Sequence, residues 1–97
     1  NAKADYNLGI ALIHLEKYKD GISHLEKSLK HGGTINNYYY LGLAYERMND
    51  YERAIKFYTL RAVNPEDSRD QIAVNAKHRV KKIKEWDVER KLSGENH

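Results

Sequence analysis

The sequence predicts an all-helical fold, made of two helical hairpins and a long closing helix in one domain that spans residues 1–97. Three observations carry this prediction. A single proline interrupts 97 residues, and proline is the strongest helix breaker. Apolar residues recur at intervals of three and four, with no run of alternating β-branched residues. The chain also repeats itself at an offset of 33 residues, and short internal periods are typical of helical repeat proteins.

The repeat is visible wherever small residues fall on small residues and bulky residues on bulky ones. The matching pairs are Leu8 with Leu41, Gly9 with Gly42, Ala11 with Ala44, Leu12 with Tyr45, Leu15 with Met48, Tyr18 with Tyr51, Gly21 with Ala54, Ile22 with Ile55 and Leu25 with Tyr58. We therefore place one repeat at about residues 2–33 and a second at about 35–66.

The first repeat contains two helical patterns, over about residues 2–15 and 18–31. Gly9 lies within the first, where glycine costs about 1 kcal/mol relative to alanine. We expect it to permit a close approach by the second helix, whose apolar stripe includes Gly21, Ile22 and Leu25. The short connection near Glu16 makes the two helices antiparallel.

The second repeat follows the same plan, with helices over about residues 35–48 and 51–63. Gly32 and Gly33 can supply a left-handed residue at the end of a helix, and Thr34 can cap the next one. Asn49 with Glu52 has the spacing of a capping box. Pro65 ends the fourth helix, because the residue before a proline avoids the helical conformation.

The closing helix is predicted over about residues 68–92, opened by a capping box from Ser68 to Gln71. One apolar stripe runs along it, formed by Ile72, Ala73, Ala76, Val80 and Ile83. The remaining surface is charged, as the end of a repeat stack requires. The pattern continues through Trp86, Val88 and Leu92, which is longer than a capping helix needs.

Composition excludes several classes of function. There is no cysteine, which excludes disulfides, thiolate zinc sites and cysteine nucleophiles and leaves cytoplasm and periplasm both compatible. No apolar stretch approaches the roughly 20 residues that span a membrane. The histidines show no metal-ligand spacing, and no catalytic triad or phosphate loop is present. We therefore expect no enzyme activity, cofactor or metal.

The residues resemble the tetratricopeptide repeat family. In the second repeat the resemblance is carried by Tyr38, Leu41, Gly42, Tyr45, Tyr51, Ala54, Tyr58 and Pro65, and in the first by Leu8, Gly9, Tyr18 and Leu25. The resemblance implies an α-solenoid of two hairpins with a C-terminal capping helix. Arg61 departs from the family pattern, since a small residue is usual there, and we expect a register shift or an inward turn of Ala62.

Family members line a groove with the first helix of each hairpin, and the resemblance therefore implies a protein or peptide partner bound by such a groove. The corresponding positions are Tyr6, Ile10, Ile13, His14, Asn36, Tyr39, Leu43, Arg47, Arg69 and Ala76, with Lys3, Glu46, Ile72 or Ala73, and Arg79 or Val80 beside them. Tyrosine suits such a surface because it brings a large area and a hydroxyl at low entropic cost.

Three consecutive tyrosines cannot all face the groove, because successive helical residues are about 100° apart. We assign Tyr38, like Tyr45, to the core and Tyr39 to the groove. Ile10, Ile13 and Leu43 could equally be buried against a neighbouring helix. Family members that hold a C-terminal carboxylate use a Lys and an Asn where this chain has Tyr6 and Ile10, and Lys3 and Asn7 are out of register. We therefore expect no such clamp.

Two alternative functions stay open. An incomplete array would expose its first helix, to which Trp86, Val88 and Leu92 of another copy could dock, giving self-association. The basic run over residues 77–84 could bind nucleic acid or an acidic partner. Nucleic acid is the less favoured partner, because the net charge is only +3. In addition, Glu85, Asp87 and Glu89 can form ion pairs with the basic side chains of this run. The start at Asn1 and the presence of two repeats indicate a fragment or a processed product.

Overall fold

The computed structural model describes residues 1–94, which form five helices and no strand. They are α1 (Ala2–His14), α2 (Tyr18–Lys30), α3 (Asn36–Arg47), α4 (Tyr51–Ala62) and α5 (Gln71–Leu92). The all-helical prediction is confirmed. Within residues 1–94, none of the helices combines the length and apolar character needed to cross a bilayer.

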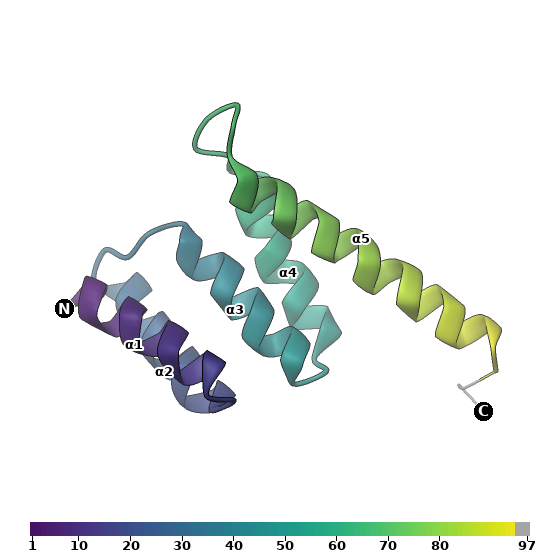
Figure 1. Ribbon diagram of the computed structural model, residues 1–97, viewed down its shortest axis with the longest axis horizontal. Coiled ribbons are helices and arrows are strands. Elements are labelled where there is room, and N and C mark those ends of the chain that lie inside the picture. Colours follow the sequence, from purple (N-terminus) through teal and green to yellow (C-terminus); the bar gives the residue numbers. More distant parts are fainter. Residues whose placement is uncertain (95–97) are drawn as a thin grey trace.

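The helices form two hairpins that stack side by side. α1 packs against α2, α3 against α4, and α2 and α4 each contact the first helix of the next unit. Figure 1 shows α1, α3 and α5 in front, with α2 and α4 behind them. The surface formed by the front helices is called the α1–α3–α5 face below.

Two apolar clusters hold the stack together. The first joins α1, α2 and α3 through Ile13, Ile22, Leu25, Leu41 and Ala44. The second joins α3, α4 and α5 through Ala54, Tyr58, Ala76 and Ile83, with Tyr39 and Leu43 packed against it. Because α3 contributes to both clusters, it couples the two hairpins.

Glycines allow the helices within each hairpin to approach closely. A Cβ atom on Gly9 would lie 2.8 Å from Leu25 Cγ and 3.0 Å from the backbone oxygen of Gly21. On Gly42 it would lie 2.8 Å from the ring of Tyr58. Neither space would hold a methyl group without movement, so the close approach expected from the glycines is confirmed.

The turns within the hairpins repeat like the helices. Glu16 and Asn49, 33 residues apart, both have φ of 63°, the left-handed conformation that ends a helix. Because Asn49 adopts it, the N-cap of α4 is Asp50, whose carboxylate accepts from Arg53 N at 3.2 Å. The predicted capping box of Asn49 with Glu52 is therefore wrong by one residue.

The start of α5 also differs from the sequence pattern. Its N-cap is Asp70, whose carboxylate accepts from Ala73 N at 3.0 Å, so the helix begins at Gln71 and not within a capping box opened by Ser68. Arg61 explains the difference, because it binds Asp70 and holds it at the helix start.

Arg61 is fully buried and continues the buried stripe of Ala54 and Tyr58, so the register of α4 is not shifted. Ala62 is half-buried and packs against the second apolar cluster. Its Nη2 donates to both oxygens of Asp70 at 2.8 Å, and its Nε donates to Asn36 Oδ1 at 2.9 Å. Nη1 donates to the backbone oxygen of Asn64 at 3.2 Å. The guanidinium thus joins α3, α4 and the start of α5, and the expectation of a register shift is corrected.

Candidate functional site

A row of tyrosines crosses the α1–α3–α5 face. The ring of Tyr6 on α1 meets Tyr40 on α3 edge to face, with centroids 5.9 Å apart. Tyr40 meets Tyr39 at 5.4 Å, and Tyr39 meets Tyr58 of α4 at 5.5 Å. Edge-to-face pairs at these distances are favourable beyond the area they bury. Tyr6, Tyr40 and Tyr39 thus form a preorganised aromatic surface on α1 and α3, and the buried Tyr58 anchors it to α4.

Partial burial moves the pKa of two of these phenols, Tyr6 and Tyr39, further above neutral pH. Desolvation is the first cause that raises the pKa of Tyr6, and the same cause raises the pKa of Tyr39, with the neighbouring Tyr40 adding to both. Both hydroxyls therefore stay protonated at neutral pH and can donate as well as accept hydrogen bonds. A surface of this kind suits peptide backbone groups and apolar side chains together.

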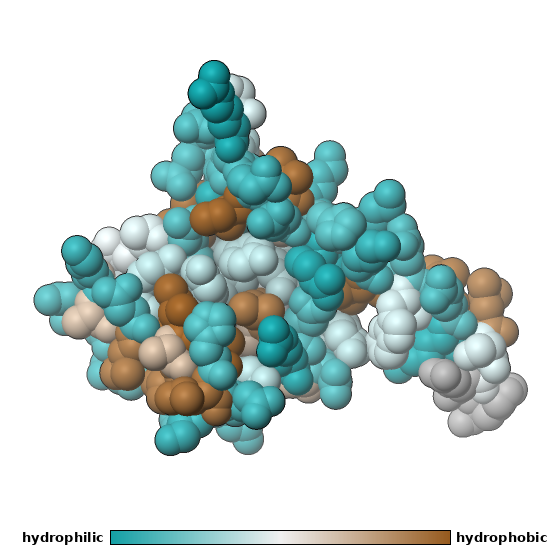
Figure 2. All heavy atoms as spheres, in the orientation of Figure 1, coloured by the Kyte–Doolittle hydropathy of each residue, from teal (hydrophilic) through white to brown (hydrophobic). Residues whose placement is uncertain are grey.

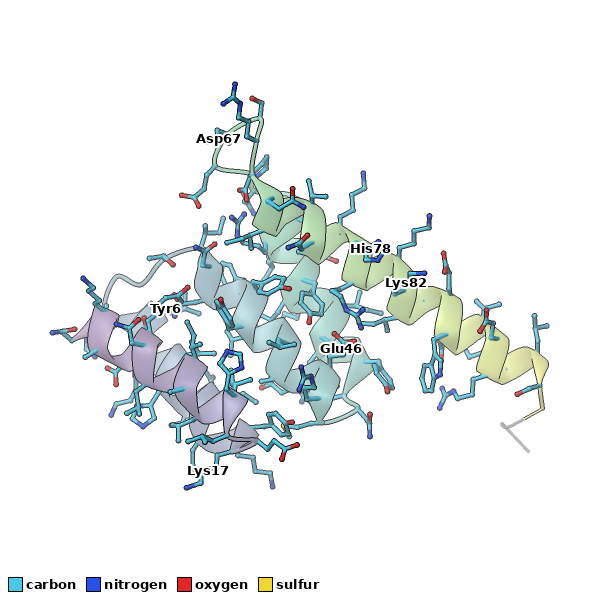
Figure 3. The ribbon with its side chains drawn as sticks, viewed as in Figure 1. Tyr6, Lys17, Glu46, Asp67, His78 and Lys82 are labelled. Carbon is cyan, nitrogen blue, oxygen red and sulfur yellow. The ribbon has the colours of Figure 1, made fainter. Side chains whose placement is uncertain are left out.

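A polar cluster ends the row on the side of α5. Tyr58 donates its hydroxyl hydrogen to Glu46 Oε1 at 2.8 Å, and Glu46 is also bound by the guanidinium of Arg79. Burial, followed by the hydrogen bond to Glu46, raises the pKa of Tyr58 strongly. Figure 3 shows Glu46 on α3 on the side that faces α5, with Tyr6 at the far end of the face on α1. Glu46 and Arg79 therefore tie α3 to α5.

Two hollows flank the row of tyrosines. One, of about 310 Å³, lies beside Tyr6 and is lined also by Ala2, Lys3, Ser28, Gly32, Gly33 and Thr34. The other, of about 350 Å³, is lined by Glu46, Tyr51, Arg79, Lys82, Ile83 and Trp86. Figure 2 shows the same face, with apolar side chains gathered over α1 and hydrophilic ones along much of α5. The face therefore grades from apolar to charged.

The structure distributes the ten predicted groove residues over three kinds of position. His14, Arg47 and Arg69 are exposed, whereas Tyr6, Ile10, Asn36, Tyr39 and Leu43 are half-buried. Arg69 lies in the loop before α5 and not on the helix. The side-chain oxygen of Asn36 accepts a hydrogen bond from Arg61, so the role of Asn36 is partly structural.

Two of the ten residues are core residues, and their assignment to the groove is corrected. Ile13 is 2% exposed and packs between α1 and α2, where its Cγ1 lies close to Gly21. Ala76 is fully buried in the cluster between α4 and α5. Both sit on the helix faces that make the stack, so neither side chain is presented to a partner.

Tyr38 and Tyr45, which were expected in the core, are half-buried and packed against the first apolar cluster. Both rings stack on Phe57 of α4, with centroid distances of 6.2 Å and 5.6 Å. Tyr39 lies on the other side of α3 and is also half-buried. The division of the three consecutive tyrosines between two faces thus follows the helical rotation.

The basic run over residues 77–84 does not pair with acidic residues as expected. Arg79 turns to Glu46, while Lys77, Lys81, Lys82 and Lys84 are exposed. Asp87 binds Arg90 at 2.7 Å and Lys91 at 3.1 Å, both further along α5. The predicted neutralisation of the run by Asp87 is therefore corrected.

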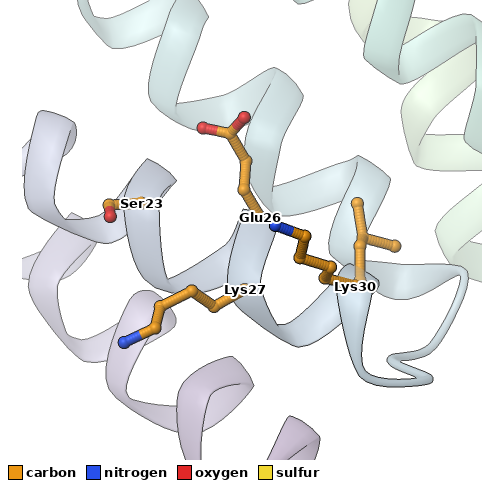
Figure 4. Close-up of a pocket in the computed structure, with 5 residues that line it drawn as sticks. Ser23, Glu26, Lys27 and Lys30 are labelled. Atoms are coloured by element: carbon orange, nitrogen blue, oxygen red, sulfur yellow. The ribbon is translucent and has the colours of Figure 1, made fainter.

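A further hollow of about 560 Å³ lies against α2 and is lined by Ser23, Glu26, Lys27, Leu29 and Lys30. All five residues belong to one helix, and Figure 4 shows Glu26 and Lys27 pointing in different directions. A single convex helix provides no converging polar groups, so this hollow is a surface depression and not a binding site. Among residues 1–94, no three His, Asp or Glu side chains gather as a metal site would require.

Comparison with known proteins agrees with this arrangement. The sequence model of the tetratricopeptide repeat family matches residues 1–60, which include both helices of the first hairpin and most of the second. The chain belongs to the tetratricopeptide repeat family. No curated protein and no solved structure matches it. Tetratricopeptide repeats are typically non-catalytic scaffolds that bind other proteins, and protein partners follow for this chain from its family.

Sequence reasoning missed the polar connections of this tetratricopeptide domain. Asn37, fully buried, donates from Nδ2 to the backbone oxygen of Leu25 at 3.0 Å and accepts from Thr34 N at 3.0 Å. The repeat could have revealed this residue, because Asn37 falls 33 residues after Ala4, on the stripe of the helix that faces the preceding helix. A polar residue at such a core position indicates a specific hydrogen-bonded partner.

Proposed function

We propose that this chain is a non-catalytic scaffold that binds a peptide segment of a partner protein along the α1–α3–α5 face. The observation that carries the proposal is the continuous row of Tyr6, Tyr40 and Tyr39. The centroids of neighbouring rings in this row are 5.9 Å and 5.4 Å apart. Ile10 and Leu43 flank the row and are half-buried. Rigid aromatic side chains that carry hydroxyls are typical of binding surfaces.

The partner peptide would be apolar at its centre and acidic toward the ends. Ile10, Tyr39 and Leu43 offer apolar and aromatic contacts, while the exposed His14 and Arg47 border the surface with basic groups. Glu46 is already bound by Arg79 and Tyr58, so it adds little negative potential. A C-terminal carboxylate clamp is not proposed, because Tyr6 and Ile10 occupy the clamp positions.

The proposal is tested with peptides selected on the protein from a random phage-displayed library. The selected peptide is titrated into ¹⁵N-labelled protein, and the largest amide shifts are expected at Tyr6, Ile10, Tyr39 and Leu43. Shifts that gather instead on α2 or α4 would overturn the proposal. The same titration with Ile10→Lys and with the exposed Arg47→Glu should weaken binding, and circular dichroism checks that both variants remain helical.

A matched control distinguishes surface contacts from loss of the fold. Tyr39 packs on Tyr58, so its removal would disturb the core as well as the surface. Ser23 on α2 is exposed and far from the α1–α3–α5 face in the stack, and Ser23→Lys should bind the selected peptide like the unmodified protein.

A second candidate function is self-association through α1. Leu8 and Leu15 are 45% and 67% exposed, and they lie on one stripe of α1 with Ala4 and Ala11. Their counterparts 33 residues later, Leu41 and Met48, pack against α2. The stripe on α1 is therefore shaped to meet another helix, which a second copy could supply.

Sedimentation equilibrium over a wide concentration range tests self-association. If the stripe is the contact, Leu8→Glu with Leu15→Glu should return a dimer to a monomer. A monomer at every concentration removes this candidate and leaves the peptide-binding proposal untouched.

A further inference from the structure

The groove between α4 and α5 holds an apolar hollow outside the α1–α3–α5 face. Its volume is about 650 Å³, and it is lined by Thr59 and Ala62 of α4, by Val63 at the C-cap of α4 and by Lys77, Val80, Lys81, Lys84 and Glu85 of α5. Val63 is 64% exposed, and Ala62 and Val80 are half-buried. The floor of the hollow is thus apolar and open to solvent.

Three lysines border this floor. Lys77, Lys81 and Lys84 follow one another at intervals of four and three residues, so they lie along one side of α5 over about 10 Å. All three are exposed. Within residues 1–94, the salt bridges made by α5 use Arg79, Arg90 and Lys91, and none uses these lysines. Glu85 is the one carboxylate in the lining, so the rim has a net positive charge.

This hollow is separate from the peptide-binding face proposed above. Lys77 and Arg79 are two residues apart, and hence about 200° apart around the helix. Arg79 faces α3 through Glu46, so Lys77 points away from the α1–α3–α5 face. Binding at one surface therefore does not require the other.

The combination of floor and rim selects one kind of occupant. A polyanion such as nucleic acid would satisfy the lysines and leave Val63 and Val80 in water, while an uncharged apolar peptide would strip water from the ammonium groups without replacing it. An amphipathic helix with apolar residues on one face and carboxylates beside them satisfies both. Grooves between packed helices accept such a helix in many complexes.

We propose that the α4–α5 groove is a second docking surface, which binds an acidic amphipathic helix of a partner protein with its apolar face on Val63 and Val80 and its carboxylates on Lys77, Lys81 and Lys84. The lysine stems add apolar contact beneath their charged ends. A carboxylate pattern of the same four-and-three spacing on the bound helix would match the three lysines in register.

The probe is a fluorescein-labelled synthetic helix with leucines at helical spacing and glutamates on both sides of the leucine stripe. A second peptide carries glutamine in place of every glutamate, and labelled oligo-dT represents nucleic acid. Binding is measured by fluorescence anisotropy at low and high salt. The acidic helix should bind more tightly than the other two, and its affinity should fall as salt rises.

Variants then locate the site. Lys77→Glu, Lys81→Glu and Lys84→Glu together should weaken binding of the acidic helix by about tenfold or more, since three exposed ion pairs become repulsive. Val63→Asp should weaken it comparably. The matched control reverses the same number of exposed lysines on α2, namely Lys19, Lys27 and Lys30, and should change affinity by much less.

Each contrary outcome overturns the proposal. If oligo-dT binds as tightly as the acidic helix and Val63→Asp has no effect, the surface is a polyanion site. If the α2 control weakens binding equally, the attraction is unspecific. If sedimentation shows a dimer that Val63→Asp dissociates, the occupant is a second copy. Because the mutated lysines and Val63 are exposed, circular dichroism should show an unchanged fold for these variants. Ile10→Lys, on the α1–α3–α5 face, should leave this binding intact.

Discussion

Arg61 and Asp70 form a two-oxygen ion pair at 2.8 Å that is almost entirely removed from solvent, with side-chain exposures of 0% and 6%. Asp70 is at the same time the N-cap of α5, and it accepts from the backbone nitrogens of Glu66 and Ala73 at 2.7 Å and 3.0 Å. One carboxylate therefore anchors the last helix to the second hairpin and shapes the loop between them.

Replacing Arg61 with methionine should strongly destabilise the domain. The change keeps the length of the side chain but leaves the Asp70 carboxylate and Asn36 Oδ1 without their donor, and breaking a buried pair lowers the free energy of unfolding by about 3 kcal/mol. Urea denaturation followed by circular dichroism measures the effect. Arg53→Met is the matched control, because Arg53 pairs with Asp50 but is 63% exposed. Equal losses in the two variants would show that burial is not the cause.

The Asp70 carboxylate should make the stability of the domain depend on pH in the acid range. Hydrogen bonds from the backbone of Glu66 and Ala73, and then Arg61, lower the pKa of Asp70 from 3.8 to about 2. Its folded pKa is below its unfolded pKa, so its contribution to stability is fully present above the unfolded pKa of 3.8 and is lost as the pH falls through about 2. Asp70→Asn should be less stable at neutral pH and should lose less stability on acidification.

Denaturation midpoints across the acid range check this dependence. The stability of Asp70→Asn should still fall with pH in the acid range, because the pKa values of Asp5, Asp50 and Asp87 are also lowered by their partners. Asp67→Asn, an exposed change of the same charge in the same loop, should retain the wild-type slope. A slope in Asp70→Asn as steep as that of wild type would contradict the assignment.

Alanine at Gly9 or Gly42 should destabilise the protein although it favours the helix. Alanine gains about 1 kcal/mol in helix propensity, but its methyl group would lie 2.8 Å from Leu25 Cγ or from the ring of Tyr58. Overpacking of a filled core costs about 1–3 kcal/mol, and at Gly9 the backbone oxygen of Gly21 leaves little room to yield. Thermal melts should show a lower midpoint for both variants. Ser23→Ala on the exposed side of α2 shows the propensity effect alone, and a midpoint raised by Gly9→Ala would refute the close approach.

Asn37→Leu should separate the first hairpin from α3. Asn37 is fully buried and joins the backbone of Leu25 to that of Thr34. Leucine leaves the Thr34 amide without its acceptor and removes the second bond to Leu25 O, which keeps its helical bond within α2; the loss of such bonds costs about 1–3 kcal/mol. Hydrogen exchange of the Thr34 amide, which donates to Asn37, should become faster in the variant. Asn7→Leu on the exposed side of α1 provides the control, with exchange at Thr34 unchanged.

The helices could be predicted because their signals are local. Gly9 and Gly42 indicated close contact within each hairpin, and Gly32, with φ of 84°, ended α2 as expected. The capping predictions at Asn49 and Ser68 were wrong for different reasons. Asn49 adopts the left-handed conformation that ends α3, so it cannot be the N-cap of α4. Asp70 caps α5 while it binds Arg61, nine residues earlier, and local spacing does not reveal this contact.

The groove residues could be predicted only in part, because periodicity within a single helix is also a local signal. Rotation around α3 assigned Tyr39 to the groove and Tyr38 to the core, but Ile13 and Ala76, which were assigned to the groove, are buried. Each stands on the boundary between the groove side and the packing side of its helix. At such a position the crossing of the next helix decides burial, and periodicity within one helix does not.

The amino-acid sequence by itself determined the helical class, the period of 33 residues and the glycines at the contacts, since propensity, periodicity and side-chain size act within a few residues. The tertiary structure decided which polar side chains connect the helices, because the bonds of Arg61 to Asp70, Glu46 to Arg79 and Asn37 to Leu25 join residues between nine and 33 positions apart. Such partners become neighbours only after the hairpins have packed, when burial makes an unpaired polar group costly and selects the residue that satisfies it.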